Sequence, residues 1–132
     1  MKHTIKIELG QKSYHGHANT VKKSDKRHAK WKKQRVKNGF DDTETWNLDT
    51  TLARFLLPRL KRFREVNIGH PAYMTWESWC ALIDRMIEGL EIQLNEAVLL
   101  DKNLSAKEEK KNREKVRMAW LLLGRYGRDL WW

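Results

Sequence analysis

The chain has 132 residues, 40% of them hydrophobic and 33% charged, and its formal net charge is +10. This length and composition fit one globular domain with a modest core, and they exclude both a disordered chain and two independent domains. One cysteine, Cys80, excludes an internal disulfide, and the lack of any apolar run near the roughly 18 residues of a membrane helix predicts a soluble intracellular protein without a signal peptide or membrane span.

The positive charge is concentrated at the start of the chain. Residues 1–40 hold twelve Lys and Arg against two acidic residues, whereas residues 41–132 hold fifteen residues of each sign. Because charge distribution decides where polyanions are attracted, this asymmetry indicates which part of the chain meets an anionic partner. We therefore divide the chain into a basic N-terminal arm, residues 1–39, and a helical domain, residues 40–132.

The arm has little regular patterning. Polar and apolar residues alternate in residues 4–9, which predicts one short strand. Residues 11–39 lack apolar periodicity and end in Asn38-Gly39, a pair typical of a turn or a helix end. The segment 22–37 buries too little apolar surface to offset its ordering entropy. We expect it to be largely irregular and mobile in the free protein, and whether it forms a helix in contact with a partner stays open.

The helical domain is predicted to begin with a helix over about residues 43–65. Asp41 and Glu44 have the spacing of a helix cap, and the apolar residues that follow recur at intervals of three and four. Pro58 lies inside this stripe. Because proline lacks a backbone donor and crowds the preceding turn, we expect a kink or a break near Leu57.

Two further helices have clearer start signals. Thr75 precedes an apolar stripe that continues to Val98, and Ser105 with Glu108 forms a capping-box pattern for the last helix. Three tryptophans on these stripes are expected in the core, namely Trp76, Trp79 and Trp120. The expected fold is mainly α, a bundle of about three helices preceded by the basic arm.

The densest cluster of cations lies in the arm. Nine Lys and Arg fall within sixteen residues around Trp31. Such cations neutralise phosphates, and an aromatic ring stacks on an unpaired base. Together with a second cluster beside Pro58, the candidate nucleic-acid-binding residues are Lys22, Lys23, Lys26, Arg27, Lys30, Trp31, Lys32, Lys33, Arg35, Lys37, Arg59, Lys61 and Arg62. The alternatives are a solvated tail or an anchor on acidic lipid or protein for the arm, and an ordinary charged helix face for the second cluster.

The chain ends in three large apolar residues, Leu130, Trp131 and Trp132. They either dock on the domain or offer an aromatic anchor to a protein partner. The histidines of the arm, such as His15 and His17, lack the further ligands of a structural metal site, and no catalytic motif is present. We therefore expect a protein that is not an enzyme, with no catalytic residue, metal site or cofactor.

Several segments of the helical domain resemble a family of small uncharacterised proteins of tailed bacteriophages. The segments that carry the resemblance are GFDD at 39–42, TWNLD at 45–49, FLLPRLKRF at 55–63, LLGRY at 122–126 and DLW at 129–131. The resemblance covers roughly residues 39–132. It implies a viral origin and expression in the bacterial host's cytoplasm, and it supplies no activity.

These observations favour a non-enzymatic phage accessory protein that binds nucleic acid through its cationic arm. The alternative is a protein-interaction module that inhibits a host enzyme or defence complex. A virion component and a homo-oligomer also stay open, as do the strand type of the nucleic acid and the identity of a host protein.

Overall fold

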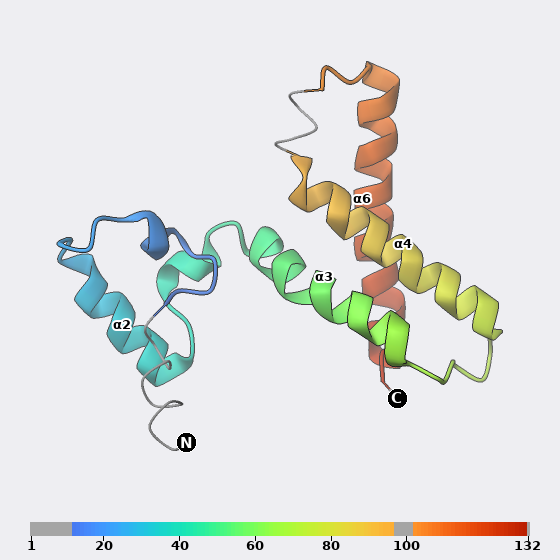
Figure 1. The fold of residues 1–132 in the computed structure, drawn as a ribbon, viewed down its shortest axis with the longest axis horizontal. Coiled ribbons are helices and arrows are strands. Elements are labelled where there is room, and N and C mark those ends of the chain that lie inside the picture. The colour runs from blue at the N-terminus through green and yellow to red at the C-terminus, as the bar shows by residue number, and fades with distance from the viewer. Residues whose placement is uncertain (1–11, 97–101, 132) are drawn as a thin grey trace. The chain divides into compact units, whose positions relative to one another are not determined.

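The computed structural model describes residues 12–96 and 102–131, which form two units (Figure 1). Unit 1 extends to Leu52 and unit 2 starts at Ala53. The division falls inside a helix instead of between residues 39 and 40. The described residues are mainly helical and contain no strand, and the strand expected over residues 4–9 lies outside them.

Unit 1 contains two short 3-10 helices, η1 (His17–Thr20) and η2 (Asp42–Thr45), and the α-helix α2 (Arg27–Asn38) between them. Two residues before the first residue of α2, Asp25 accepts a hydrogen bond at its Oδ1 from the backbone N–H of Arg27 at 2.9 Å. Gly39 ends it with a φ of 84°, a left-handed conformation that favours glycine. The expectation of an irregular arm is therefore wrong for these residues, because polar contacts replace the missing apolar stripe.

The helix α3 (Leu48–Val66) belongs to both units and runs through Pro58 without interruption. Of the two outcomes expected near Leu57, a kink or a break, the break is absent. One lost backbone donor leaves the rest of the hydrogen-bond ladder intact, and the Arg59 guanidinium donates to the carbonyl of Phe55 at 2.8 Å. The predicted cap of Asp41 is present, but it caps η2 instead of this helix.

Unit 2 packs the later part of α3 with α4 (Trp76–Leu94) and α6 (Ala106–Tyr126), and η3 (Gly127–Asp129) follows α6. Both predicted caps are confirmed, since Thr75 accepts from the Ser78 N–H at 3.1 Å and Ser105 accepts from the Glu108 N–H at 3.2 Å. The buried core cluster consists of Ala53, Leu60, Met86, Leu90 and Leu122. The mainly α, bundled fold is thus confirmed.

The helices α4 and α6 approach closely at Gly89. A Cβ atom built on Gly89 would lie 2.3 Å from the Cβ of Ala119 and 2.5 Å from the carbonyl oxygen of Lys115. Both atoms belong to α6, and the second is backbone. The absence of a side chain at position 89 therefore allows this packing.

The tryptophans of α4 and α6 differ in burial. Trp79 is 1% exposed and confirms its expected place in the core. Trp120 is half-buried and donates its indole N–H to Gln93. Trp76 is 37% exposed, so its core placement is wrong; it is the first residue of α4, where the helix has not yet reached the core. None of the described helices is long and apolar enough to cross a bilayer.

Candidate nucleic-acid interface

The centre of unit 1 is a buried ion pair between α2 and the start of η2. Arg35 and Asp41 are 8% and 0% exposed, and the Arg35 Nη1 lies 2.6 Å from the Asp41 Oδ2. The Asp41 Oδ1 accepts hydrogen bonds from both the backbone N–H and the hydroxyl of Thr43. Each buried charge therefore has a partner, as the low dielectric of an interior requires.

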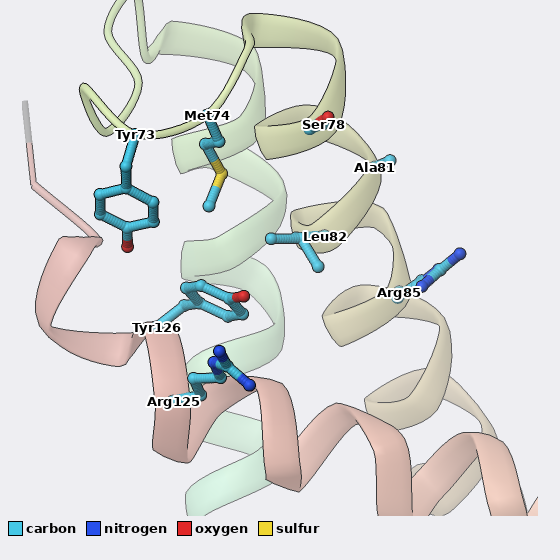
Figure 2. Close-up of a pocket in the computed structure, with 8 residues that line it drawn as sticks. All are labelled: Tyr73, Met74, Ser78, Ala81, Leu82, Arg85, Arg125 and Tyr126. Atoms are coloured by element: carbon cyan, nitrogen blue, oxygen red, sulfur yellow. The ribbon is translucent and has the colours of Figure 1, made fainter.

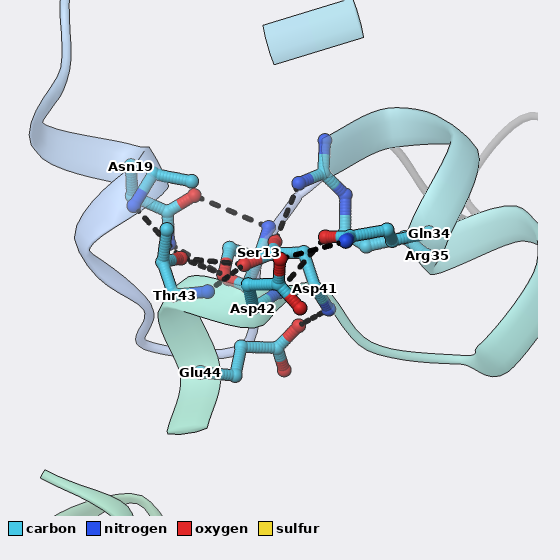
Figure 3. A network of polar contacts seen from close by, with 9 residues as sticks. Ser13, Asn19, Gln34, Arg35, Asp41, Asp42, Thr43 and Glu44 are labelled. Carbon is cyan, nitrogen blue, oxygen red and sulfur yellow. Dashed lines mark hydrogen bonds and ion pairs between the residues drawn. The ribbon is translucent and has the colours of Figure 1, made fainter. Parts of the chain in front are cut away.

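A second set of hydrogen bonds joins η1 to η2 (Figure 3). The Thr43 hydroxyl oxygen accepts from the backbone N–H of Ala18 at 3.0 Å. The Ser13 N–H donates to the Asn19 side-chain oxygen, and the Asn19 amide donates back to the Ser13 carbonyl. A Cβ on Gly16 would fall 2.1 Å from the Ser13 hydroxyl, so this corner is closely packed. Polar contacts thus connect η1, α2 and η2 into one folded unit.

The network also sets the charge of Asp41. Burial raises the pKa of the Asp41 carboxyl, but hydrogen bonds from Thr43, Arg35 and Ser13 outweigh burial and hold this pKa below its usual value. The carboxylate is therefore ionised at neutral pH and neutralises Arg35.

Trp31 lies on the buried side of α2. Its side chain is 6% exposed, with the Arg27 guanidinium 5.2 Å from its ring centroid and the His28 ring edge-on at 5.3 Å. In this conformation Trp31 does not present its ring to a base, because the ring is buried and is contacted by Arg27 and His28 of α2.

The cations of α2 fall into two groups. The helix holds six Lys and Arg and no acidic residue. Three of them pair with carboxylates, and these pairs are Arg27–Asp25, Lys30–Asp42 and Arg35–Asp41. The other three, Lys32, Lys33 and Lys37, are exposed and form no ion pair with any residue that the structure describes. They remain available to an external anion.

Helical spacing places Lys33 and Lys37 on the same side of α2, one turn apart, and Val36 beside them is 66% exposed. Three more exposed lysines precede the helix, Lys22, Lys23 and Lys26. We call these six lysines the α2 lysine surface: Lys22, Lys23, Lys26, Lys32, Lys33 and Lys37. It contains most of the arm's predicted nucleic-acid-binding residues, but neither Trp31 nor Arg35.

The second predicted cluster, on α3, is differently arranged because each of its cations has a partner. Arg59 lies 3.8 Å over the ring of Phe55, besides its bond to that residue's carbonyl. Lys61 pairs with Glu91 on α4, and Arg62 pairs with Glu65 within α3. These contacts favour the ordinary charged helix face over a phosphate-binding patch.

A hollow of about 600 Å³ lies in unit 2 beside one end of α4 and α6. Eight residues line it, and these are Tyr73, Met74, Ser78, Ala81, Leu82, Arg85, Arg125 and Tyr126. Figure 2 shows Leu82 and Tyr126 directed toward its middle and Arg85 pointing away from both. The Tyr73 hydroxyl donates to Asp129, which raises the pKa of Tyr73 to about 12. The lining of the hollow is therefore mixed, with arginine and tyrosine side chains beside apolar ones.

The residues of the predicted C-terminal interface differ in how far they are buried. Leu130 packs against the core of unit 2. Trp131 is 75% exposed and borders a hollow of about 250 Å³ whose other lining includes Pro71 and Trp79. Trp132 lies outside the described residues. Of the three, Trp131 is the one that the structure places at the surface.

The Asp41 network was not identified from the sequence. The capping pattern of Asp41 and Glu44 was visible, but nothing near Ser13 or Arg35 in the sequence marks either as its partner. The described residues contain no group of three or more His, Cys, Asp and Glu side chains that could hold a metal ion. No family model matches the chain, and no match is found among curated proteins or solved structures.

Proposed function

We propose that this protein binds nucleic acid, without catalysing a reaction, by contacts between the α2 lysine surface and the phosphate backbone. The observation that carries the proposal is the contrast within α2: three of its cations are paired with carboxylates, and three exposed lysines have no ion pair among the described residues. Lysines at a surface of this kind release condensed counterions when they meet phosphates.

The energetics of α2 support this function. Lys33 and Lys37 stand one turn apart, and like charges at that spacing destabilise a helix by roughly 0.2–0.5 kcal/mol. No carboxylate within α2 compensates for this repulsion. A bound polyanion would relieve it. The helix thus keeps a local arrangement that is unfavourable alone and favourable on an anionic partner.

The burial of Trp31 refines the mode of binding. With its ring inside unit 1, contacts from this surface go to phosphates, which carry no sequence information. The complex should therefore be strongly dependent on salt and tolerant of sequence. The resemblance to phage proteins supports an accessory role in the bacterial cytoplasm.

The first test replaces Lys32, Lys33 and Lys37 together by glutamine. Up to three phosphate contacts would be lost, so the slope of log K against log salt for duplex DNA should fall by about 2–3. Fluorescence anisotropy over a salt series measures this slope, and circular dichroism checks that the variant keeps its helices.

A matched control replaces Lys107, Lys110 and Lys111 of α6 by glutamine. These lysines are also exposed and lie on one helix, so the change in net charge is identical. The control should keep the wild-type slope. Equal decreases of the slope in the two variants would show that net charge alone, and not the α2 lysine surface, determines binding. Failure of the wild-type protein to bind at low salt would refute the proposal.

Trp131 favours a second function, a protein-interaction module that acts on a host enzyme or defence complex. An exposed tryptophan beside an apolar hollow has the character of an interface anchor. Replacing Trp131 by alanine should abolish retention of a host protein that the wild-type chain retains from bacterial lysate. Replacing Trp46, another exposed tryptophan, should not. Identical sets of retained proteins for all three chains would contradict this function.

A further inference from the structure

Unit 1 contains a cavity of about 610 Å³ that shares Lys23 with the α2 lysine surface. Four of its lining residues carry, or can carry, a positive charge: Lys12, Lys23, His28 and Arg35. No carboxylate occurs among the described residues that line it. Ala18 and Val21 supply an apolar part of the wall. The volume is within the range of roughly 300–1,000 Å³ that ligand sites in proteins occupy.

Two of the four cationic groups are held in place. Arg35 is 8% exposed and is fixed by its contact with Asp41, so its guanidinium does not need to be ordered when a ligand arrives. The Nε2 atom of His28 lies 3.2 Å from the carbonyl oxygen of Val21 and 2.9 Å from that of Lys22. Carbonyl oxygens only accept, so Nε2 carries a proton and the ring orientation is fixed.

The charges of the cavity suit a dianion. Asp41 neutralises Arg35, which leaves the two lysines, Lys12 and Lys23, as uncompensated charges. Both are exposed and have no ion pair with a described residue. A terminal phosphate carries about −1.5 to −2 at neutral pH, whereas a phosphodiester inside a strand carries about −1. A concave site also admits the end of a chain more readily than a continuous backbone.

We propose that this cavity binds a phosphate monoester, namely the terminal phosphate of a nucleic-acid strand. The inference rests on the proposed nucleic-acid binding and adds to it a preference for strand ends. Lys12 and Lys23 contact the phosphate oxygens, Arg35 provides a fixed donor surface, and the apolar wall lies against the terminal nucleoside. Free mononucleotides carry the same group, so the test separates them from strand ends.

The experiment compares three single-stranded oligonucleotides of one sequence: one with a 5′-phosphate, one with a 3′-phosphate and one with hydroxyls at both ends. Anisotropy of an internal label measures the affinity of the full chain for each. One phosphorylated strand should bind about tenfold more tightly than the hydroxyl strand, as two added charge-assisted contacts allow. Inorganic phosphate and a nucleoside monophosphate serve as competitors.

Variants assign the preference to the cavity. Glutamine at both Lys12 and Lys23 should remove the tenfold difference between strands, and it should also weaken all strands because Lys23 belongs to the α2 lysine surface. Glutamine at both Lys32 and Lys33 should weaken all strands and keep the difference. Equal affinity of the wild-type chain for the three strands would overturn the cavity proposal and leave the proposed function intact if binding is salt-dependent. If no strand binds, the proposed function fails, and binding of the nucleoside monophosphate then tests the cavity by itself. Weak binding of the monophosphate that is lost in the Lys12 and Lys23 variant would support the cavity proposal. No binding of the monophosphate to the wild-type chain would overturn it.

Discussion

Replacing Asp41 by alanine should open unit 1 and leave unit 2 folded. The substitution leaves the Arg35 guanidinium buried without its carboxylate and removes the acceptor of both Thr43 hydrogen bonds. Breaking a buried ion pair from one side costs about 3–5 kcal/mol. Amide hydrogen exchange should therefore accelerate by roughly a hundredfold to several thousandfold in α2, with little change in α4 and α6.

Asp42 provides a matched control for this substitution. It is the next residue in the chain, and it also pairs with a cation of α2, Lys30, but at an exposed site. Exposed pairs of this kind contribute at most about 1 kcal/mol. Alanine at Asp42 should therefore leave exchange in α2 nearly unchanged. Equal acceleration by the two substitutions would show that the buried pair does not hold unit 1 together.

Low pH should open unit 1 of the wild-type protein in the same way as replacement of Asp41. Because the pKa of Asp41 in the folded chain lies below its ordinary value of 3.8, the carboxylate stabilises unit 1 fully above about pH 4. This stabilisation is lost as the pH falls through the folded-state pKa. Hydrogen exchange in α2 should accelerate in that window, and the Asp41 variant should lack this part of the pH dependence.

The sequence predicts unit 2 well because its signals are local. The capping residues of α4 and α6 each accept a hydrogen bond from a backbone N–H three residues later in the chain. The apolar stripe of α4 contains Met86 and Leu90, which lie in the core. Pro58 does not break α3, because buried residues before and after it, Ala53 and Leu60, pack in the core. Apolar periodicity thus predicts the bundle and not the continuity of each helix.

Unit 1 could not be predicted in the same way because its contacts are long-range and polar. The bond between Thr43 and Ala18 joins residues 25 apart, and the Ser13 and Thr43 hydroxyls meet across 30 residues. Apolar periodicity carries no information on such contacts. A segment with few apolar residues is therefore predicted to be irregular, although a buried ion pair stabilises its folded structure.

The candidate site shows the same limit. The exposure of its lysines follows from residue type alone, since lysine remains at the surface in most folds. Charge alone does not separate them from Arg35, which stands four residues after the buried Trp31 and shares its face of α2. Nor does it predict the cavity, because Lys12 and Lys23 come together with His28 only once η1 and α2 are folded.

Replacing Gly89 by alanine should destabilise unit 2. The added methyl would overlap the Cβ of Ala119 and the backbone carbonyl of Lys115, neither of which can rotate away. Overpacking of this kind costs about 1–3 kcal/mol, and the upper end applies where backbone must move. Since 1 kcal/mol corresponds to roughly 4–8 °C in a unit of this size, Tm should fall by about 10 °C or more.

Gly124 of α6 gives the opposite expectation and so controls for helix propensity. A Cβ at this position meets nothing within 4 Å, and alanine is favoured over glycine in a helix by roughly 0.5–1 kcal/mol. Alanine at Gly124 should therefore raise Tm by several degrees, which differential scanning calorimetry resolves. If both substitutions raise Tm, α4 and α6 do not approach closely at Gly89. Opposite signs would establish that contact between the two helices, not propensity, requires glycine there.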